Sequence, residues 1–310
     1  MATTHILILS EDAHALAAAL QPDLPANAQL HPCSDDTQLP AEAACAGVAL
    51  AAPDRLLQAL PELPALQWAQ STWAGVTPLV NADRRDYRLT GVKGLFDDAI
   101  SEYVLAWILA LQRNVLQRAI DKHWNRTPDG NLAGKRVGIM GTGALGTAVA
   151  RRAVPFGVQL RGFNTRGEAP LPFNECYRKA DRLGFAANLD FVIALMPDTP
   201  ATSALIDEGF LRALPRGAVL INAGRANAID HAALRYALAG GHLRAAVLDV
   251  LPHEPLPAAD PLWHTPGIYI TSHTAAPTES IAVAPLFLDN LERYLAGGEL
   301  RYEIDFRRGY

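Results

Sequence analysis

A glycine-rich turn that directly follows a short apolar strand constrains the fold of this chain more than any other feature of its sequence. The turn is Gly141-Thr142-Gly143-Ala144-Leu145-Gly146, and it follows Val137–Met140 and opens a helical stretch. In this strand-turn-helix context, the spacing predicts a dinucleotide site. Gly141 allows the tight turn, Gly143 lets the backbone approach a pyrophosphate, and Gly146 lets the helix pack on the strand. The alternative is a tight turn in an α/β protein that binds another ligand.

The alternation of apolar strands with helical stretches predicts an α/β protein with parallel sheets covered on both faces. Strands are expected at Ile6–Leu9, Val48–Ala51, Leu66–Gln70, Arg136–Met140, Val158–Phe163, Phe191–Leu195, Val219–Asn222, Ala245–Asp249 and Ile268–Thr271. We therefore expect two Rossmann-like, doubly wound domains. A dinucleotide-binding domain would span 100–274, and a discontinuous substrate domain would combine 1–99 with 275–310. A ligand cleft is expected between them.

A long apolar stretch without glycine or proline, Ala99–Arg118, predicts one heavily buried helix. Tyr103, Trp107, Ala110 and Leu111 would share its buried face. Packing inside the domain and packing in a dimer interface would give the same pattern. We keep both readings, and the second predicts a homodimer. A last helix is expected between Ala275 and about Leu295.

The overall composition indicates a globular protein and excludes several partners. Of the 310 residues, 50% are hydrophobic and 19% charged, and the net charge is only −5. That charge gives no reason to expect nucleic acid or an anionic membrane as partner. Three cysteines without a CxxC pair predict reduced thiols in the cytoplasm. Neither a signal peptide nor a run of about 20 apolar residues is expected, and no residue spacing predicts a metal site.

The end of the second strand of the nucleotide domain indicates which dinucleotide is bound. An acidic residue usually stands there to bind the adenosine ribose, but this strand ends in Asn164-Thr165-Arg166. Asn164 and Thr165 can donate hydrogen bonds, and Arg166 can pair with a 2′-phosphate. The sequence therefore predicts NADPH. The alternative is that Arg166 is a solvated loop charge and that NADH is accepted through Asn164.

Three polar residues downstream of the glycine turn suggest the reduction of a 2-oxo acid. Arg225, Glu254 and His273 each follow a predicted strand, at the sheet edge where such folds place ligands. The guanidinium of Arg225 fits a planar carboxylate. His273 can donate the proton that the nascent alkoxide needs. A carboxylate beside that imidazole, supplied by Glu254, would favour its protonated form.

Several long motifs in this order resemble the D-isomer-specific 2-hydroxyacid dehydrogenases, and among them the bacterial glyoxylate/hydroxypyruvate reductases of the A type. The resemblance begins near Leu66 and covers nearly all of the remaining chain. Its motifs are Leu132–Ile139, the glycine turn, Met196–Thr202, Ile221–Asp230, Asp249–Pro257, Thr271–Ala276 and Asp305–Tyr310. Departures from the usual pattern are Thr77, Ala226 and Thr274, and none of them removes a catalytic group.

The resemblance implies a role for each matching residue. Arg225 would bind the substrate carboxylate and carbonyl, His273 would be the acid/base, and Glu254 would orient His273. Asp249 would contact the nicotinamide carboxamide, and the backbone N–H groups of Ala74 and Gly75 would hold the substrate carboxylate. Further cofactor contacts are expected at Ala144, Leu145, Met196, Pro197 and Ala223.

The substrate is predicted from weaker evidence near the start of the resemblance. Trp73 adjoins the carboxylate loop, and if it walls the pocket it favours small substrates such as glyoxylate and hydroxypyruvate. A packing role for Trp73 is the alternative. Two other functions remain open: a non-catalytic, nucleotide-sensing relative, and an NAD-linked dehydrogenase of another acid such as phosphoglycerate. His253 and His264 are interpreted as loop and packing residues.

Overall fold

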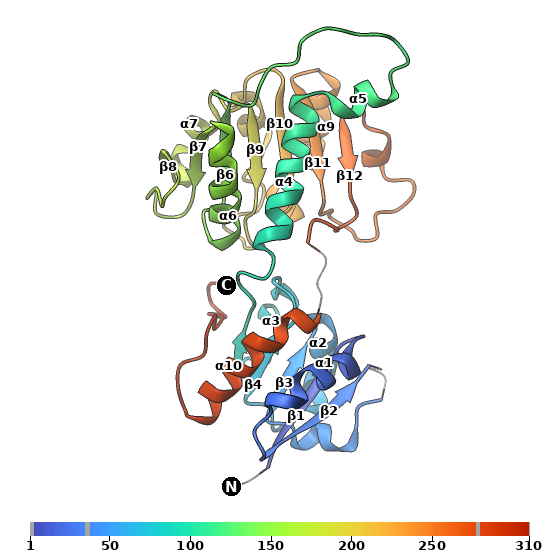
Figure 1. The fold of residues 1–310 in the computed structure, drawn as a ribbon, viewed down its shortest axis with the longest axis vertical. Helices are drawn as coiled ribbons and strands as arrows, with labels where there is room; N and C mark the ends of the chain where they lie inside the picture. The colour runs from blue at the N-terminus through green and yellow to red at the C-terminus, as the bar shows by residue number, and fades with distance from the viewer. Residues whose placement is uncertain (1–2, 35–37, 277–279, 310) are drawn as a thin grey trace. The chain divides into compact units, whose positions relative to one another are not determined.

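The computed structural model of the chain describes residues 3–34, 38–276 and 280–309. The chain divides into two compact units. Unit 1 comprises Met1–Leu95 and Thr278–Tyr310, and unit 2 comprises Phe96–Pro277. Each unit is a parallel sheet with helices (Figure 1), which confirms the predicted α/β class and the two Rossmann-like folds. The boundaries lie within a few residues of those expected at 99 and 275.

The described part of unit 1 holds a five-stranded sheet in the order β2-β1-β3-β4-β5, in which every neighbouring pair is parallel. This is a doubly wound order. The strands are β1 (Thr4–Leu9), β2 (Ala28–Cys33), β3 (Val48–Ala51), β4 (Trp68–Ser71) and β5 (Arg88–Thr90). The helices are α1 (Ala13–Leu20), α2 (Pro53–Ala59), α3 (Thr77–Val80) and α10 (Ala284–Leu295). The sequence did not predict β2 and β5, because β2 carries polar residues and a proline and β5 is only three residues long.

The described part of unit 2 holds a seven-stranded parallel sheet in the order β12-β11-β10-β9-β6-β7-β8. This is the dinucleotide-binding arrangement, and the strand order reverses between β6 and β9. The strands are β6 (Arg136–Met140), β7 (Gln159–Phe163), β8 (Glu175–Tyr177), β9 (Phe191–Ala194), β10 (Ala218–Asn222), β11 (Leu243–Leu248) and β12 (Ile268–Ile270). The helices are α4 (Asp97–Gln112), α5 (Val115–Ile120), α6 (Ala144–Ala153), α7 (Arg182–Ala186), α8 (Glu208–Ala213) and α9 (His231–Ala239). The short edge strand β8 was not predicted from the sequence.

The glycine turn connects β6 to α6 at the point where the strand order reverses. Gly141 has a φ of +101°, and a Cβ atom added there would lie 2.8 Å from the Leu195 carbonyl oxygen. A Cβ atom at Gly146 would lie only 1.8 Å from the Gly141 oxygen. At Gly143, in contrast, an added Cβ would have no atom within 4 Å. Packing therefore requires glycine at 141 and 146, whereas Gly143 faces open space.

The single helix predicted from 99 to 118 is wrong in two respects. The chain forms α4 and then α5, and they are separated at Asn114, which has a φ of 48° and starts the second helix in the left-handed conformation. Of the predicted buried face of α4, Leu111 is buried, but the other buried apolar residues are Ile100, Val104 and Ile108. Tyr103 and Trp107 lie at its margin, where Trp107 packs on Tyr269 of β12.

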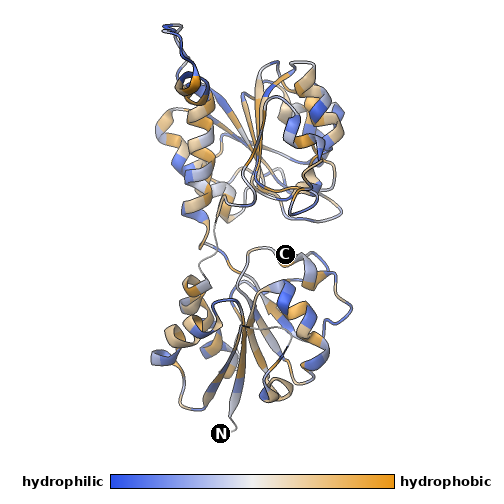
Figure 2. Ribbon diagram, turned by 90° about the vertical axis from the view of Figure 1, so that its right-hand side faces the viewer, coloured by the Kyte–Doolittle hydropathy of each residue, from blue (hydrophilic) through white to orange (hydrophobic). Residues whose placement is uncertain are grey.

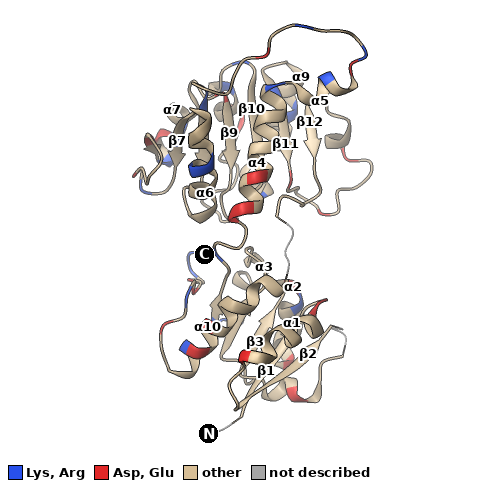
Figure 3. Ribbon diagram, viewed as in Figure 1, with Lys and Arg blue, Asp and Glu red and all other residues tan. Residues whose placement is uncertain are grey.

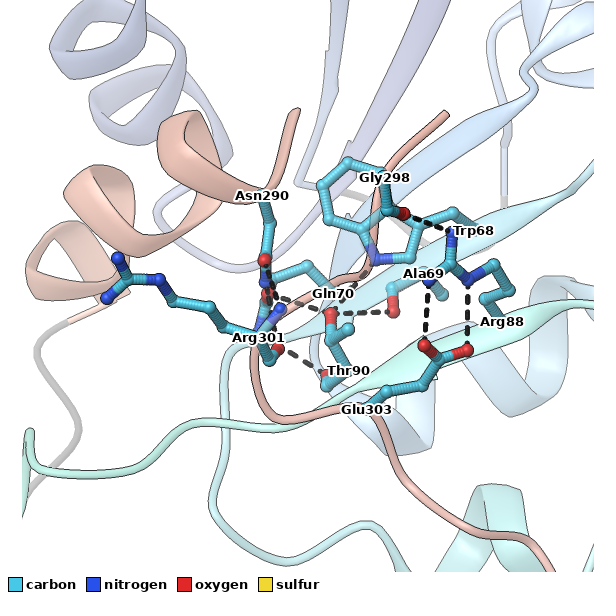
Figure 4. A network of polar contacts seen from close by, with 9 residues as sticks. All are labelled: Trp68, Ala69, Gln70, Arg88, Thr90, Asn290, Gly298, Arg301 and Glu303. Atoms are coloured by element: carbon cyan, nitrogen blue, oxygen red, sulfur yellow. Dashed lines mark hydrogen bonds and ion pairs between the residues drawn. The ribbon is translucent and has the colours of Figure 1, made fainter. Parts of the chain in front are cut away.

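The C-terminal segment is tied into unit 1 by a buried polar network (Figure 4). The Asn290 side chain of α10 donates to Gln70 Oε1 at 3.0 Å and to the Arg301 carbonyl at 3.1 Å, and it accepts from the Arg301 N–H at 2.7 Å. Thr90 links Gln70 to Trp68 through two further hydrogen bonds. The segment after α10 therefore closes against β4 and β5, far from it in sequence.

Apolar residues concentrate on the strands and on the helix faces that cover them in each unit (Figure 2). Basic and acidic residues are interspersed on both units (Figure 3), as the mild net charge leads one to expect. Over the described ranges, every helix is too short or too polar to cross a membrane.

We predict that Asn290→Ala destabilises unit 1. The change removes the partner of the Arg301 N–H and C=O groups and one partner of Gln70, and an unmet buried polar group costs about 1–3 kcal/mol. Thermal unfolding followed by circular dichroism should show a lower melting temperature. Glu292→Ala on the exposed face of the same helix is the control and should leave it unchanged. Equal melting temperatures for the two variants would contradict the structural role of the network.

We also predict that two alanine substitutions in the glycine turn differ sharply in their effect on stability. Gly146→Ala forces its Cβ against a backbone oxygen, and such overpacking costs about 3 kcal/mol. Gly143→Ala adds a methyl group in open space and should change stability by less than ~0.5 kcal/mol. The measurement is chemical unfolding of unit 2 in both variants. A Gly143→Ala protein that is as unstable as Gly146→Ala would refute the described turn.

Candidate active site

The three residues singled out in the sequence come together at one edge of the unit 2 sheet. Arg225 follows β10, Glu254 follows β11 and His273 follows β12, and these strands are neighbours in the sheet. All three side chains line one cavity of about 590 Å³. The other residues of its wall are Asp198, Ala226, Asn227, Ile229, His231, Val250, Leu251 and Pro252.

His273 and Glu254 form a hydrogen-bonded pair. The distance from His273 Nδ1 to Glu254 Oε2 is 2.7 Å, and the other carboxylate oxygen accepts from the Leu251 N–H at 2.8 Å. Glu254 is thus held by its own loop while it holds the imidazole. Since Nδ1 is engaged by the carboxylate, Nε2 is the nitrogen left for proton exchange with a ligand. The His273 side chain is 54% exposed, so a ligand can reach it.

Arg225 is a partly buried cation presented by a tight turn. The Asn222 side chain accepts from the Gly224 N–H at 3.1 Å and donates to the Arg225 carbonyl at 3.1 Å, which shapes this turn. A Cβ at Gly224 would lie 2.9 Å from Leu195 Cα, so only glycine fits. Burial lowers the pKa of the Arg225 guanidinium, and the carboxylates of Asp198 and Glu254 oppose this effect. A poorly hydrated cation of this kind binds an anionic ligand more strongly than an exposed one does.

The Asp249 carboxylate holds the loop that carries His273. It accepts from Thr271 Oγ1 at 2.6 Å, from the Thr274 N–H at 2.8 Å and from the Ala275 N–H at 3.1 Å. The Asp249 carbonyl also accepts from the His273 N–H at 2.7 Å. With a side chain only 2% exposed, Asp249 is mainly engaged inside the protein. Its predicted contact with a nicotinamide carboxamide stays a prediction.

The predicted cofactor residues lie around the start of α6, and the turn there fits a pyrophosphate. The open space at Gly143 leaves the backbone accessible, and Ala144 is exposed at the first turn of the helix, where N–H groups are free to bind an anion. Leu145 is half-buried behind them. Of the residues after β9 and β10, Pro197 is exposed, whereas Met196 and Ala223 are buried and offer their backbone rather than their side chains.

At the end of β7, the structure changes the role expected of Asn164. Its side-chain N–H groups donate to Thr142 Oγ1 and to the Glu168 carbonyl, both at 2.8 Å, and its oxygen accepts from the backbone of Arg166 and Gly167. Asn164 therefore builds the turn, and its donors are already used. Thr165 and Arg166 are exposed beside it.

A second cation that the sequence analysis missed stands next to this turn. Arg178 follows the neighbouring strand β8, and a Cβ added at Gly167 would lie 3.8 Å from Arg178 Cβ. Because β8 was not predicted, the position of Arg178 at the end of a strand could not be inferred from the sequence. Arg178 forms an exposed ion pair with Asp181, in which Nε and Oδ2 are 3.4 Å apart, and Glu168 of the turn is also exposed.

The loop expected to hold a substrate carboxylate lies in unit 1, directly after β4. In the described part of the chain, the N–H groups of Ala74 and Gly75 have no hydrogen-bond acceptor. The Ser71 hydroxyl fixes the loop by accepting from the Trp73 N–H at 3.0 Å and donating to the Trp73 carbonyl at 2.7 Å. The Trp73 side chain is 38% exposed.

Of the wall residues that were not predicted from the sequence, Asn227 and His231 each carry a buried polar atom. Among the described residues, the buried Asn227 Oδ1 and His231 Nε2 atoms have no hydrogen-bond partner. Burial lowers the pKa of His231, although Asp230 and Asp260 oppose this effect. Asn227 lies within the Ile221–Asp230 motif and His231 directly follows it, but neither was given a role from the sequence.

Comparison with known proteins places this architecture in a family. Residues 105–275 match the family model of the D-isomer specific 2-hydroxyacid dehydrogenase, NAD binding domain. The glyoxylate/hydroxypyruvate reductase A of Escherichia fergusonii is 34% identical over 194 residues, which are 61% of each chain. This chain thus covers less than two thirds of that relative.

Two crystal structures extend the similarity over almost the whole chain. A D-isomer specific 2-hydroxyacid dehydrogenase family protein from Aeromonas salmonicida is 34% identical with a TM-score of 0.91, over 98% of this chain and 100% of the other. An NADPH-dependent glyoxylate/hydroxypyruvate reductase from Sinorhizobium meliloti, in complex with NADP and sulfate, is 26% identical with a TM-score of 0.87, over 99% and 100%. The chain therefore belongs to the D-isomer specific 2-hydroxyacid dehydrogenases and is an NAD(P)-dependent oxidoreductase.

Proposed function

We propose that this enzyme uses NADPH to reduce small 2-oxo acids, glyoxylate and hydroxypyruvate, to the 2-hydroxy acids glycolate and D-glycerate. The observation that carries the proposal is the joint placement of Arg225, Glu254 and His273 on one cavity, with a 2.7 Å hydrogen bond between the last two. The names of the Escherichia and Sinorhizobium relatives support the same substrates.

Each member of the trio has a distinct task in this reaction. The Arg225 guanidinium binds the substrate carboxylate and polarises the carbonyl oxygen, because its planar fork matches both acceptors. His273 donates the proton from Nε2 to that oxygen as the carbonyl carbon is reduced. Glu254 holds the imidazole through Nδ1, which leaves Nε2 for the substrate. In the reverse direction, His273 accepts the proton of the hydroxyl group.

The glycine turn and the start of α6 would hold the pyrophosphate of the cofactor, which when bound supplies the hydride. We propose that Arg166 and Arg178 bind the 2′-phosphate, because both are exposed cations at the ends of adjacent strands. The end of β7 itself carries no acid that would repel that phosphate. NADH remains the weaker alternative.

We propose that the free N–H groups of Ala74 and Gly75 bind the substrate carboxylate. Trp73 would limit the size of the substrate, and its exposed indole supports this role over packing alone. We further propose a homodimer, because α5 and the loop after it expose apolar side chains: Val115, Leu116, Ile120 and Trp124. The free thiols of Cys45 and Cys176 favour a reducing compartment, the cytoplasm.

We predict that a steady-state panel of 2-oxo acids gives the highest kcat/KM with glyoxylate and hydroxypyruvate. His273→Ala should lower kcat at least ~100-fold, the usual range for loss of a general acid. Its KM should change little, because Arg225 is intact. His253→Ala, which alters the exposed histidine next to Glu254, is the control and should keep normal turnover.

Normal turnover in His273→Ala would exclude this histidine as the proton donor. If the wild-type protein bound NADPH but reduced none of the acids, a nucleotide-sensing role would replace the proposed one.

We predict that Arg166→Ala and Arg178→Ala each raise the KM for NADPH about tenfold, the effect of losing one charge-assisted hydrogen bond to phosphate. The KM for NADH should stay unchanged in both variants. Arg151→Ala, an exposed arginine on α6, controls for the loss of one positive charge. A wild-type preference for NADH in kcat/KM would show that these arginines do not select the cofactor.

A further inference from the structure

A chain of hydrogen bonds connects helix α4 to the loop that carries His273. Tyr103 of α4 lies 2.7 Å from Thr271, hydroxyl to hydroxyl, although the two residues are 168 positions apart. Thr271 Oγ1 in turn donates to Asp249 Oδ1 at 2.6 Å. The same Asp249 oxygen accepts from the Thr274 N–H. The chain therefore ends on the groups that flank His273.

The chemistry of these groups determines the direction of the hydrogen bonds. A threonine hydroxyl has one proton, and Thr271 gives it to the Asp249 carboxylate. Tyr103 must therefore be the donor to Thr271. Burial raises the pKa of Tyr103 to about 12, so the phenol keeps the proton that it donates.

The loop needs such support because its backbone is strained. Ser272 and His273 have φ values of 54° and 59°, in the left-handed region that side chains disfavour. Two consecutive residues in that conformation persist only when surrounding contacts hold them there. The contacts that do so are the bonds to Asp249 and that between Thr274 Oγ1 and the Thr271 carbonyl, at 2.7 Å.

We propose that Tyr103 is a positioning residue for catalysis, which acts through Thr271 and Asp249 to hold His273 where Glu254 can reach its Nδ1. The inference rests on the proposed role of His273 as proton donor. Tyr103 touches none of the three catalytic side chains in the described contacts, so its effect has to pass along the hydrogen-bond chain. Thr271 is the link on which that effect depends.

Four variants test this chain of hydrogen bonds. Tyr103→Phe should lower kcat about fivefold, the effect of losing one hydrogen bond. Thr271→Val should lower it about 30-fold, because it removes a donor to Asp249 and leaves the Tyr103 hydroxyl without an acceptor. Thr271→Ser keeps the hydroxyl and should stay within about twofold of wild type. Adding Tyr103→Phe to Thr271→Val should cost less than about twofold more, since the pathway is already broken.

Two readouts separate positioning from simple packing. In Tyr103→Phe, only kcat should fall, because the imidazole is positioned less well for proton transfer. KM for NADPH should stay unchanged. Hydrogen exchange at the Thr274 and Ala275 amides should accelerate, and this measurement needs no turnover.

Tyr269→Phe is the matched control. It removes a phenol oxygen from strand β12, which precedes Thr271, and leaves the chain of hydrogen bonds from Tyr103 to Asp249 intact. It should behave as wild type in every assay. The proposal is overturned if Tyr103→Phe matches Tyr269→Phe, or if it lowers only the melting temperature. If the wild-type protein reduced no 2-oxo acid, the proposed function would fail, whereas the exchange rates would still decide whether Tyr103 holds the loop.

Discussion

At the carboxyl edge of the unit 2 sheet, the loops after β6, β9 and β10 pack so closely that only glycine fits where they touch. The loop after β6 touches itself at Gly146 and Gly141, and Gly141 also approaches the chain at Leu195. The loop after β10 meets the same stretch of backbone at Gly224. The cofactor turn and the turn that presents Arg225 are therefore built on one shared contact, and a shift in either would disturb both.

The acidic residues of the site divide their tasks according to burial. Asp249 is inaccessible and uses its carboxylate to order a strained loop. Glu254 is partly exposed and directs one oxygen at its own loop and one at His273. Because a buried carboxylate is stable only when donors surround it, the hydrogen bonds that satisfy Asp249 are also those that place the histidine.

The residues with a chemical signature could be predicted, and those that act through the fold could not. The strands that precede the glycine turn, Arg225, Glu254 and His273 can each be predicted from their apolar sequence. In a parallel sheet, the ends of these strands lie at one edge, so the four features come together there. Arg178 escaped notice because β8 is three residues long. Tyr103 and Thr271 carry no local signal, since their pairing arises only when α4 packs beside β12. Asn164 was misjudged because a sequence does not show that its donors are spent within the turn.

The charges of the cavity favour a substrate with a single carboxylate. The part of the cavity wall that unit 2 forms contains two carboxylates, those of Asp198 and Glu254, together with the Arg225 guanidinium and the His273 imidazole. One anionic group can pair with the arginine, but a second would meet the field of those carboxylates. A phosphorylated acid would bring about two more negative charges. This balance supports the proposed substrates, glyoxylate and hydroxypyruvate, over a phosphoglycerate-like acid, independently of the size limit proposed for Trp73.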